Sequence, residues 1–269
     1  ILEWVTEEEE LEDLYYYSIR VGIEKQAQEL GHEIFRVFNL EDWGPLEKAD
    51  GIIALGKYSP ETIHQLESYQ KKIVFVDSNT LVYGHTCVMT DFETSVYQAL
   101  AYLIESGHNQ IGLLVGQETT ADNRPLQTDP RYLSFKYFLK EKELYHPDYI
   151  RVGHFSSDSG YEMMKEMIDE LGDRLPSAFF MASDALAVGA LRALQEASIP
   201  VPDQVSLISF NDTSIAKHVY PPLSTVTVYT EEMGKQAIHS LLQDLQRGDS
   251  GIPTMHTLAT HLTIRESTR

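Results

Sequence analysis

The chain has 269 residues, of which 42% are hydrophobic and 23% are charged, proportions that are ordinary for a folded protein and exclude a disordered or fibrous chain. Its 41 acidic residues outnumber its 21 basic residues, and the net charge of −20 disfavours direct binding to the phosphate backbone of DNA. No stretch approaches the roughly 18 consecutive apolar residues of a membrane span, and the single cysteine, Cys87, excludes a disulfide framework or a zinc site built from several cysteines.

Short apolar runs alternate with segments of helical spacing along most of the chain. Several runs, such as IIAL at 52–55, IVFV at 73–76 and AFFMA at 178–182, are apolar at consecutive positions, which is typical of strands covered on both faces. The predicted strands are residues 1–5, 34–38, 51–55, 72–76, 86–90, 111–115, 150–155, 178–182, 205–209, 225–228 and a last one near 257–264.

Helical spacing between these strands supplies the other half of the pattern. One helical pattern stops at Gly31 and another stops before Gly107, so both glycines are predicted helix C-caps. An acidic run at 6–13 precedes the first helix and is interpreted as its N-terminal cap. Because strands and helices alternate, we predict an α/β fold with parallel sheets and right-handed crossovers. Further helices are predicted at residues 130–143, 157–171, 185–197 and 230–246.

A polar segment near the middle of the chain indicates two lobes. About ten strands are too many for one comfortable sheet, and GQETTADNRPLQTD at 116–129 separates two halves that each look like a βαβ set. In open parallel sheets, ligands bind at the carboxyl ends of the strands. Two such lobes facing each other would therefore form a cleft for a small molecule.

The sequence lacks the motifs of common enzymes. It has no G-x-S-x-G nucleophile elbow, no P-loop and no G-x-G-x-x-G after the first strand. The two closest histidines, His256 and His261, are expected on opposite faces of one strand, which disfavours a metal site. We therefore expect neither an enzyme nor a bound metal or cofactor.

Polar and aromatic residues follow the carboxyl ends of successive predicted strands. Asp91, Phe155, Ser183 and Asn211 each stand at such a position. An aromatic ring can pack against the apolar face of a sugar, and planar side chains can pair with neighbouring hydroxyl groups. Capping of the following helices is the alternative for Ser183 and Asn211 and for the aspartate after each of them. The convergence of several strand ends favours a sugar-binding site.

Longer motifs carry a family resemblance. They are ESGHNQIGLLVG (105–116), SSDSGYEMM (156–164), FFMASDALAVGALRAL (179–194), IPVPDQVSLISFNDTSIAKHVYPPLSTV (199–226), EEMGKQAI (231–238) and IREST (264–268), with weaker matches at RVGIE (20–24), ADGIIAL (49–55) and VFVD (74–77). Together they resemble the effector-binding core of the lactose/galactose repressor (LacI/GalR) family, whose fold is that of the type I periplasmic sugar-binding proteins. The string FNDTSIAKH is most similar to galactose-type repressors of Gram-positive bacteria.

The resemblance implies roles for individual residues. Arg131 matches the family arginine that hydrogen-bonds the effector, and Phe155 matches the aromatic residue that stacks on the bound ring; the alternatives are a solvated arginine at a helix start and a buried strand-end phenylalanine. Asp91 matches an aspartate at a strand end of the first lobe. Tyr15 and Tyr16 fall where the family often has two aromatic residues facing the cleft, although Tyr15 fits core packing equally well. The predicted ligand-binding residues are therefore Tyr15, Tyr16, Asp91, Arg131, Phe155, Ser183 and Asn211.

The family fold also implies how the chain is divided. The chain is expected to cross between the lobes near Gly116, near Val228 and near 248–251. A homodimer is implied, with a DNA-binding helix-turn-helix ahead of Ile1 that is missing from this sequence, so operator DNA would be bound only through that headpiece. The expected lobes are residues 1–116 with 229–248, and residues 117–228 with 249–269.

The sequence therefore predicts the effector-binding and dimerisation domain of a cytoplasmic transcriptional repressor that senses galactose or a related sugar. Its expected partners are a sugar effector and a second copy of the chain, with no membrane. One alternative is the mature sugar-binding protein of an ABC transporter, since removal of a signal peptide would equally explain a chain that begins at Ile1. An enzyme on the same fold is the second alternative, and the lack of a nucleophile or metal constellation disfavours it.

Overall fold

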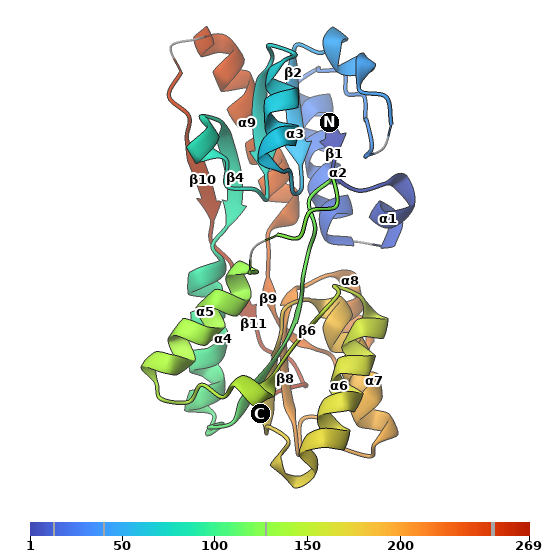
Figure 1. Cartoon of the computed structure of the whole chain (residues 1–269), viewed down its shortest axis with the longest axis vertical. Helices are drawn as coiled ribbons and strands as arrows, with labels where there is room; N and C mark the ends of the chain where they lie inside the picture. Colours follow the sequence, from blue (N-terminus) through green and yellow to red (C-terminus); the bar gives the residue numbers. More distant parts are fainter. Residues whose placement is uncertain (13, 40, 127, 249–250) are drawn as a thin grey trace. The chain divides into compact units, whose positions relative to one another are not determined.

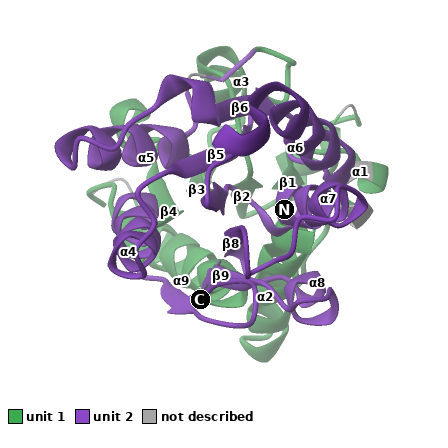
Figure 2. Ribbon diagram, turned by 90° about the horizontal axis from the view of Figure 1, so that it is seen from below, with its two compact units in different colours: residues 1–90, 119–124, 229–258 green, residues 91–118, 125–228, 259–269 purple. Residues whose placement is uncertain are grey.

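The computed structural model describes residues 1–12, 14–39, 41–126, 128–248 and 251–269. The chain folds into two compact units, coloured separately in Figure 2. Each unit combines segments that are far apart in the sequence. Unit 1 contains Ile1–Thr90, Thr119–Arg124 and Tyr229–Leu258, and unit 2 contains Asp91–Glu118, Pro125–Val228 and Ala259–Arg269.

Unit 1 is built on a parallel sheet with the strand order β1-β2-β3-β4-β10. The consecutive apolar residues of β2 and β3 are buried, as strands covered on both faces require. Its strands are β1 (Leu2–Glu3), β2 (Gly51–Leu55), β3 (Lys72–Val76), β4 (Thr86–Thr90) and β10 (Met255–Leu258). Its helices are α1 (Glu7–Glu12), α2 (Leu14–Glu29), α3 (Pro60–Glu67) and α9 (Thr230–Arg247), with 3₁₀ turns at Gly44–Lys48 and Leu81–Tyr83.

Unit 2 is built on a six-stranded sheet with the order β11-β9-β8-β7-β5-β6. The strand β11 is antiparallel to β9, and the other described pairs are parallel. Its strands are β5 (Ile111–Gly116), β6 (Ile150–Gly153), β7 (Ala178–Met181), β8 (Ser206–Asn211), β9 (Ser224–Thr227) and β11 (His261–Thr263). Its helices are α4 (Phe92–Glu105), α5 (Pro130–Glu141), α6 (Ser157–Leu171), α7 (Asp184–Glu196) and α8 (Ser214–His218), with 3₁₀ turns at Pro147–Tyr149 and Gly172–Arg174.

These two units confirm the α/β fold with parallel sheets that the sequence predicts. Both predicted C-caps are also confirmed, because Gly31 and Gly107 have φ angles of 77° and 94°, in the left-handed region that favours glycine. In the described ranges of the two units, no helix combines the length and the apolar character that crossing a membrane requires.

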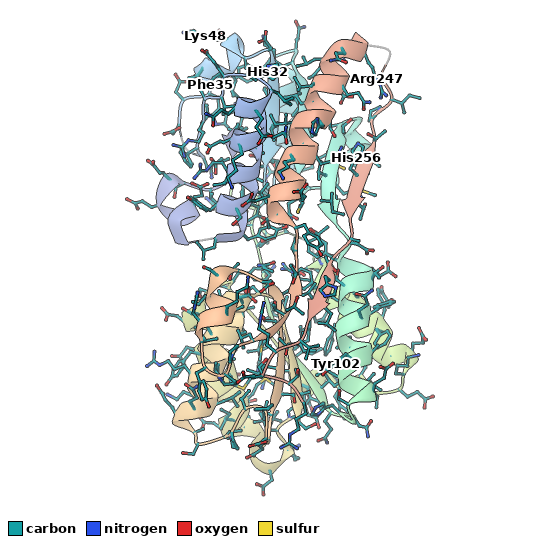
Figure 3. The ribbon with its side chains drawn as sticks, turned by 180° about the vertical axis from the view of Figure 1, so that it is seen from behind. His32, Phe35, Lys48, Tyr102, Arg247 and His256 are labelled. Carbon is teal, nitrogen blue, oxygen red and sulfur yellow. The ribbon has the colours of Figure 1, made fainter. Side chains whose placement is uncertain are left out.

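Two predicted strands differ from the observed ones. At 34–38 the described chain makes a single bridge, from Val37 to Leu2, instead of a strand. The predicted strand near 257–264 is two strands, β10 and β11, which belong to different sheets because the chain passes from unit 1 to unit 2 between them. His256, labelled in Figure 3, and His261 therefore lie in different units and not on two faces of one strand.

The units also divide the chain at other residues than the sequence analysis expects. Residues 91–116, expected in the first lobe, belong to unit 2, because α4 packs against α5 and β11 while β5 pairs with β6 and β7. The chain thus leaves unit 1 after Thr90. The division after Val228 is the same in both descriptions. The last passage lies between Leu258 and Ala259, beyond the expected 248–251, which falls partly outside the described residues.

Glycines allow α2 and α9, both labelled in Figure 1, to pack closely side by side in unit 1. A Cβ atom on Gly22 would lie 2.7 Å from the Cα atom of Glu231, and one on Gly234 would lie 2.3 Å from the carbonyl oxygen of Ile19. Both distances are too short for real Cβ atoms. In unit 2, glycines of α6 and α7 lie against the backbone of the partner helix in the same way. Each unit therefore contains a pair of helices whose backbones are in direct contact.

A buried charge cluster connects α1, α2 and β1. Arg20 of α2 donates from Nε and Nη2 to the two carboxylate oxygens of Glu10 on α1, so the acidic run supplies a buried ion pair that its interpretation as a helix cap did not include. Glu3 is 1% exposed, and its Oε1 lies 3.6 Å from Arg20 Nε. Neither carboxylate oxygen of Glu3 has a hydrogen-bond partner among the described residues. Burial, together with the Glu10 carboxylate, raises the pKa of Glu3 to about 8.

This pKa predicts a pH-dependent stability. The folded chain keeps Glu3 protonated up to about pH 8, whereas the unfolded chain releases that proton near the ordinary value of 4.5. The contribution of the protonated Glu3 to the free energy of unfolding is therefore complete below pH 4.5 and is lost as the pH rises through 8. Between these values, the free energy of unfolding falls by up to about 1.4 kcal/mol per pH unit for one proton. The free energy of unfolding of the Glu3→Gln variant, measured in urea at pH 5 to 8, is expected to lack this part of the pH dependence. Glu24→Gln, at a more exposed carboxyl beside Arg20, is the control. Equal slopes in the wild type and Glu3→Gln would contradict the prediction.

Candidate functional site

Arg131 lies at the carboxyl edge of the unit 2 sheet, in the first turn of α5. Asp129 is the N-cap of α5, and its Oδ1 accepts hydrogen bonds from the backbone amide of Arg131 at 2.8 Å and from Nε at 2.9 Å, while Oδ2 accepts one from Nη2 at 2.7 Å. Nη1 donates to the carbonyl oxygen of Ala182, just after β7, at 2.7 Å. The arginine is only 8% exposed. It is therefore held between α5 and β7 and is not the solvated helix-start arginine of the alternative interpretation.

Three aromatic rings surround the guanidinium group of Arg131. Its central carbon lies 4.5 Å from the ring centre of Phe155, 5.4 Å from that of Phe92 and 5.5 Å from that of Phe210. The rings of Phe92 and Phe210 are themselves stacked, with centres 5.8 Å apart and planes inclined by 24°. Cation–π attraction contributes about 0.5–2 kcal/mol per ring at such distances. The rings and Asp129 together fix the position of the arginine.

Phe155 follows β6 and is half-buried, unlike the fully buried Phe210. Gly116, at the end of β5, leaves room for it, since a Cβ atom there would lie 2.3 Å from the phenylalanine ring. The pairing of Gly116 with Gly153 on β6 brings the two strand ends together. An aromatic ring that is partly open to solvent therefore stands beside the arginine.

Three further predicted residues lie at the ends of neighbouring elements. Ser183 is the N-cap of α7, and its Oγ accepts a hydrogen bond from the amide of Leu186 at 3.3 Å, as the capping interpretation expects. Asp91 caps α4 in the same way, with the amide of Thr94 donating to Oδ1 at 3.1 Å. Asn211 ends β8 with a φ angle of 107°, and it is partly exposed. Asp91 belongs to unit 2 and not to the first lobe, where the resemblance expected it.

Asp184 connects the elements behind this edge. Its Oδ1 accepts hydrogen bonds from the hydroxyls of Ser209 on β8 and Thr225 on β9, and its Oδ2 accepts from the backbone amide of Thr213 at 2.6 Å and from the Thr213 hydroxyl at 2.9 Å. Burial raises the pKa of Asp184, and these hydrogen bonds oppose the rise. The carboxylate therefore ties α7 to β8, β9 and the loop after β8.

The loop after β8 is fixed from its other side by Arg265. Asp212 has a φ angle of 56°, and its Oδ1 accepts a hydrogen bond from Arg265 Nη2 at 2.6 Å. Its Oδ2 accepts from the hydroxyl of Thr227 at 2.9 Å. Asn211 and Asp212 are two successive residues with positive φ, and the ion pair of Asp212 with Arg265 and the hydrogen bonds of Asp184 to Thr213 hold the loop that contains them.

The carboxyl edge of the unit 1 sheet carries a second polar cluster. Asp77 follows β3 with a φ angle of 65° and is buried. Its Oδ2 accepts hydrogen bonds from the hydroxyl of Tyr16 at 2.7 Å and from Lys57 Nζ at 2.7 Å, and its Oδ1 accepts one from the hydroxyl of Tyr15 at 3.4 Å. The two tyrosine rings contact edge to face with centres 5.0 Å apart. Tyr15 and Tyr16 are therefore packed side chains whose hydroxyl groups converge on one carboxylate.

The structure thus places the predicted ligand-binding residues in two groups. Asp91, Arg131, Phe155, Ser183 and Asn211 lie at the carboxyl edge of unit 2, and Tyr15 and Tyr16 lie in unit 1. The sequence analysis missed several partners that fix these residues, which are Asp129, Phe92, Phe210, Asp77 and Lys57. It considered Asp184 as a strand-end residue or helix cap, but not its hydrogen bonds to β8, β9 and the loop after β8. A local signal existed for Asp129, since an aspartate before a proline is typical of a helix start.

The edge of unit 2 combines a fixed guanidinium group, a half-open aromatic ring, and side-chain amide and hydroxyl groups. This set suits a ligand with an apolar ring face and several hydroxyl groups. In the described part of the chain, no group of three or more His, Cys, Asp or Glu side chains is placed to hold a metal ion. The arrangement is suited to binding and orienting a small molecule.

Comparisons with known proteins agree with this arrangement. The sequence profile of the periplasmic binding protein-like domain matches residues 100–268. The HTH-type transcriptional regulator GalR of Streptococcus thermophilus is 52% identical over 269 residues, which make up 100% of this chain and 81% of that protein. The chain belongs to the LacI/GalR family of transcriptional regulators. The resemblance drawn from the sequence motifs is thereby confirmed.

Solved structures of LacI/GalR-family proteins share the fold. The complex of the transcriptional regulator CelR with cellobiose is 25% identical and has a TM-score of 0.85, and the match covers 99% of this chain and 83% of that one. The lac repressor dimer bound to operator and the anti-inducer ONPF is 21% identical with a TM-score of 0.84, over 99% of this chain and 92% of that one. The matched region is the effector-binding region of these regulators.

Family membership decides between the functions that the sequence left open. The chain is a LacI/GalR-family effector-binding domain, and the relatives are transcriptional regulators and not enzymes. The transporter alternative is not favoured. Regulators of the LacI/GalR family bind sugar effectors, form dimers and bind operator DNA.

Proposed function

We propose that this chain senses galactose or a related sugar and transmits its binding to an operator-bound repressor dimer in the cytoplasm. The observation that carries the proposal is the group formed by Arg131, Asp129 and Phe155 at the carboxyl edge of unit 2. The half-open ring of Phe155 offers a stacking face, and Arg131 offers N–H donors in a fixed orientation beside it. Ser183 and Asn211 are the proposed further contacts from the neighbouring strand ends.

We propose a supporting role for Tyr15 and Tyr16 at the edge of unit 1 and for Asp91 at the edge of unit 2. Tyr15 and Tyr16 hold Asp77 at the edge of unit 1, and Asp91 starts the helix that carries Phe92 against Arg131. The similarity to galactose-type repressors over the whole chain supports galactose as the first effector to test. We propose that the two units are the two lobes of the family fold, with the boundaries of the units in place of those expected from the sequence.

The proposed mechanism is a population shift in a homodimer. A sugar that binds one conformation of the dimer better than another favours that conformation, and the affinity for operator DNA changes by the same differential free energy. DNA is proposed to be bound by a helix-turn-helix headpiece and not by this domain, because the net charge of −20 repels phosphate groups. The match covers 81% of the GalR relative, so that protein has further residues outside the match that have room for such a segment.

A ligand screen with two variants tests the proposal. Galactose, glucose, lactose, ribose and the sugar phosphates are added at millimolar concentration, and the melting temperature is recorded; a ligand at 100 times its Kd adds about 2.7 kcal/mol. Arg131→Ala is expected to weaken binding of the responding sugar about 10- to 100-fold, because hydrogen bonds from a charged group contribute about 1.5–3 kcal/mol. Phe155→Ala is expected to weaken it as well, because the variant lacks the aromatic face that would stack on the sugar ring.

Arg174→Ala, at an exposed arginine of the 3₁₀ turn after α6, is the control and should bind like the wild type. Because Arg131→Ala leaves Asp129 without its main partner and lowers stability, affinities are measured by calorimetry below the melting temperature of each variant. Sugar binding that survives unchanged in both site variants would refute the proposed site. A screen without any responding sugar would refute sugar sensing itself.

A further inference from the structure

The three basic residues described above at the two carboxyl edges, Lys57, Arg131 and Arg265, are each paired with a carboxylate. In unit 2, Arg131 Nη2 lies 2.7 Å from Asp129 Oδ2, and Arg265 Nη2 lies 2.6 Å from Asp212 Oδ1. All four side chains are largely buried, so water screens these pairs little. The positive charges of this edge are therefore already neutralised by the protein itself.

The edge of unit 1 has the same property. Lys57 Nζ lies 2.7 Å from Asp77 Oδ2 and also donates to the carbonyl oxygen of Asp77. Its side chain is 15% exposed and that of Asp77 is 4% exposed. The cation is thus bound to the protein by two oxygen atoms, and the pair carries no net charge.

Further carboxylates make the edge of unit 2 negative. Asp91 and Asp184 lie there as well, and their described partners are backbone amides and hydroxyl groups and not cations. The described charged residues of this edge are therefore two arginines and four aspartates. A phosphate ester carries about −1.5 to −2 charges at pH 7. Arginine and lysine bind phosphate through charge-assisted hydrogen bonds, and a carboxylate that already accepts from the same donors competes with the phosphate.

These charges distinguish between two effectors that present the same ring. A free sugar and its phosphate share the hydroxyl groups that Phe155 and Arg131 would recognise, but the phosphate adds negative charge next to four carboxylates. Resting on the proposed function, we propose that the effector is an uncharged sugar and that Asp129 is the residue that excludes sugar phosphates. Asp129 does so by occupying Nε and Nη2 of Arg131, the two nitrogens that would otherwise bind a phosphate in the bidentate mode.

Asp129 can be changed without removing its structural role. It caps α5 by accepting from the Arg131 backbone amide, and asparagine is an equally good N-cap. Asp129→Asn therefore keeps the cap and removes the charge, whereas Asp129→Glu keeps the charge. Asp203→Asn is the matched control, because Asp203 is exposed and pairs with Arg269 away from the strand ends.

The test is isothermal titration of the wild type and these three variants with galactose, glucose and lactose and with the 6-phosphates of the three sugars. The wild type is expected to bind the responding free sugar at least tenfold more tightly than its phosphate. Asp129→Asn is expected to move this ratio at least tenfold towards the phosphate, while Asp203→Asn stays within threefold of the wild-type ratio. Asp129→Glu keeps the negative charge and is therefore expected to keep the preference for the free sugar. A thermal melt of each variant verifies that it is folded at the temperature of titration.

The outcomes separate this inference from the proposed function. A wild type that binds a sugar phosphate as tightly as the free sugar keeps the sugar sensor and overturns the uncharged effector. An unchanged ratio in a folded Asp129→Asn overturns the role of Asp129. If none of the six compounds binds the wild type, the proposed function fails, and this inference fails with it.

Discussion

Replacement of Asp184 by alanine is expected to lower the free energy of unfolding by about 4 kcal/mol and to weaken sugar binding more than tenfold. Asp184 is buried and accepts hydrogen bonds from Ser209, Thr225 and both the amide and hydroxyl of Thr213. Alanine leaves these donors unsatisfied in the interior, and each costs about 1–3 kcal/mol. The loop that carries Asn211 also loses its attachment to α7, and this loss is expected to weaken the proposed sugar contact.

Urea unfolding and calorimetric titration with the responding sugar measure the two effects of Asp184→Ala. Asp184→Asn is expected to fall between alanine and the wild type, because its amide keeps the shape but replaces one accepting oxygen by a donor facing other donors. Asp173→Ala, at an exposed position in the 3₁₀ turn after α6, is the control. A stability loss below 1 kcal/mol in Asp184→Ala would show that the carboxylate does not hold these elements together.

Replacement of Gly189 by alanine is expected to cost about 3 kcal/mol of stability, at the upper end of the range for overpacking. A Cβ atom at this position of α7 would lie 1.8 Å from the carbonyl oxygen of Ser157 and 2.6 Å from the amide nitrogen of Tyr161, both in α6. The obstacles are backbone atoms, which cannot rotate away, so the helices must separate. The gain of about 1 kcal/mol in helix propensity from glycine to alanine only partly offsets this cost.

Circular dichroism during urea unfolding measures the effect of Gly189→Ala. Arg192→Ala changes an exposed position of the same helix and is expected to stay within about 0.5 kcal/mol of the wild type. A Gly189→Ala variant as stable as the wild type would contradict the close α6–α7 contact.

The parts of the candidate site that the sequence predicted are those with a local or motif-level signal. Phe155, Ser183 and Asn211 follow apolar strand runs, and Arg131 stands in a matched family motif just inside a helix start. The residues that fix them have weaker signals. Phe92 and Phe210 are ordinary aromatic residues in the sequence, and they meet Arg131 only because α4 and β8 come together in the folded unit.

The expectations about the fold divide in the same way, between features with a local signal in the sequence and features that depend on residues far apart in the chain. The alternation of strands and helices, the strands buried on both faces and the glycine caps could all be predicted from the amino-acid sequence, because these depend on side-chain periodicity and on the backbone preferences of single residues. Other features emerge only in the folded chain: residues 91–116 join unit 2, residues 257–264 form two strands in two sheets, and Asp129, Asp77 and Asp212 each neutralise a cation. Strand pairing, burial and most ion pairs depend on residues far apart in the chain, and no local pattern specifies which of several similar partners will meet.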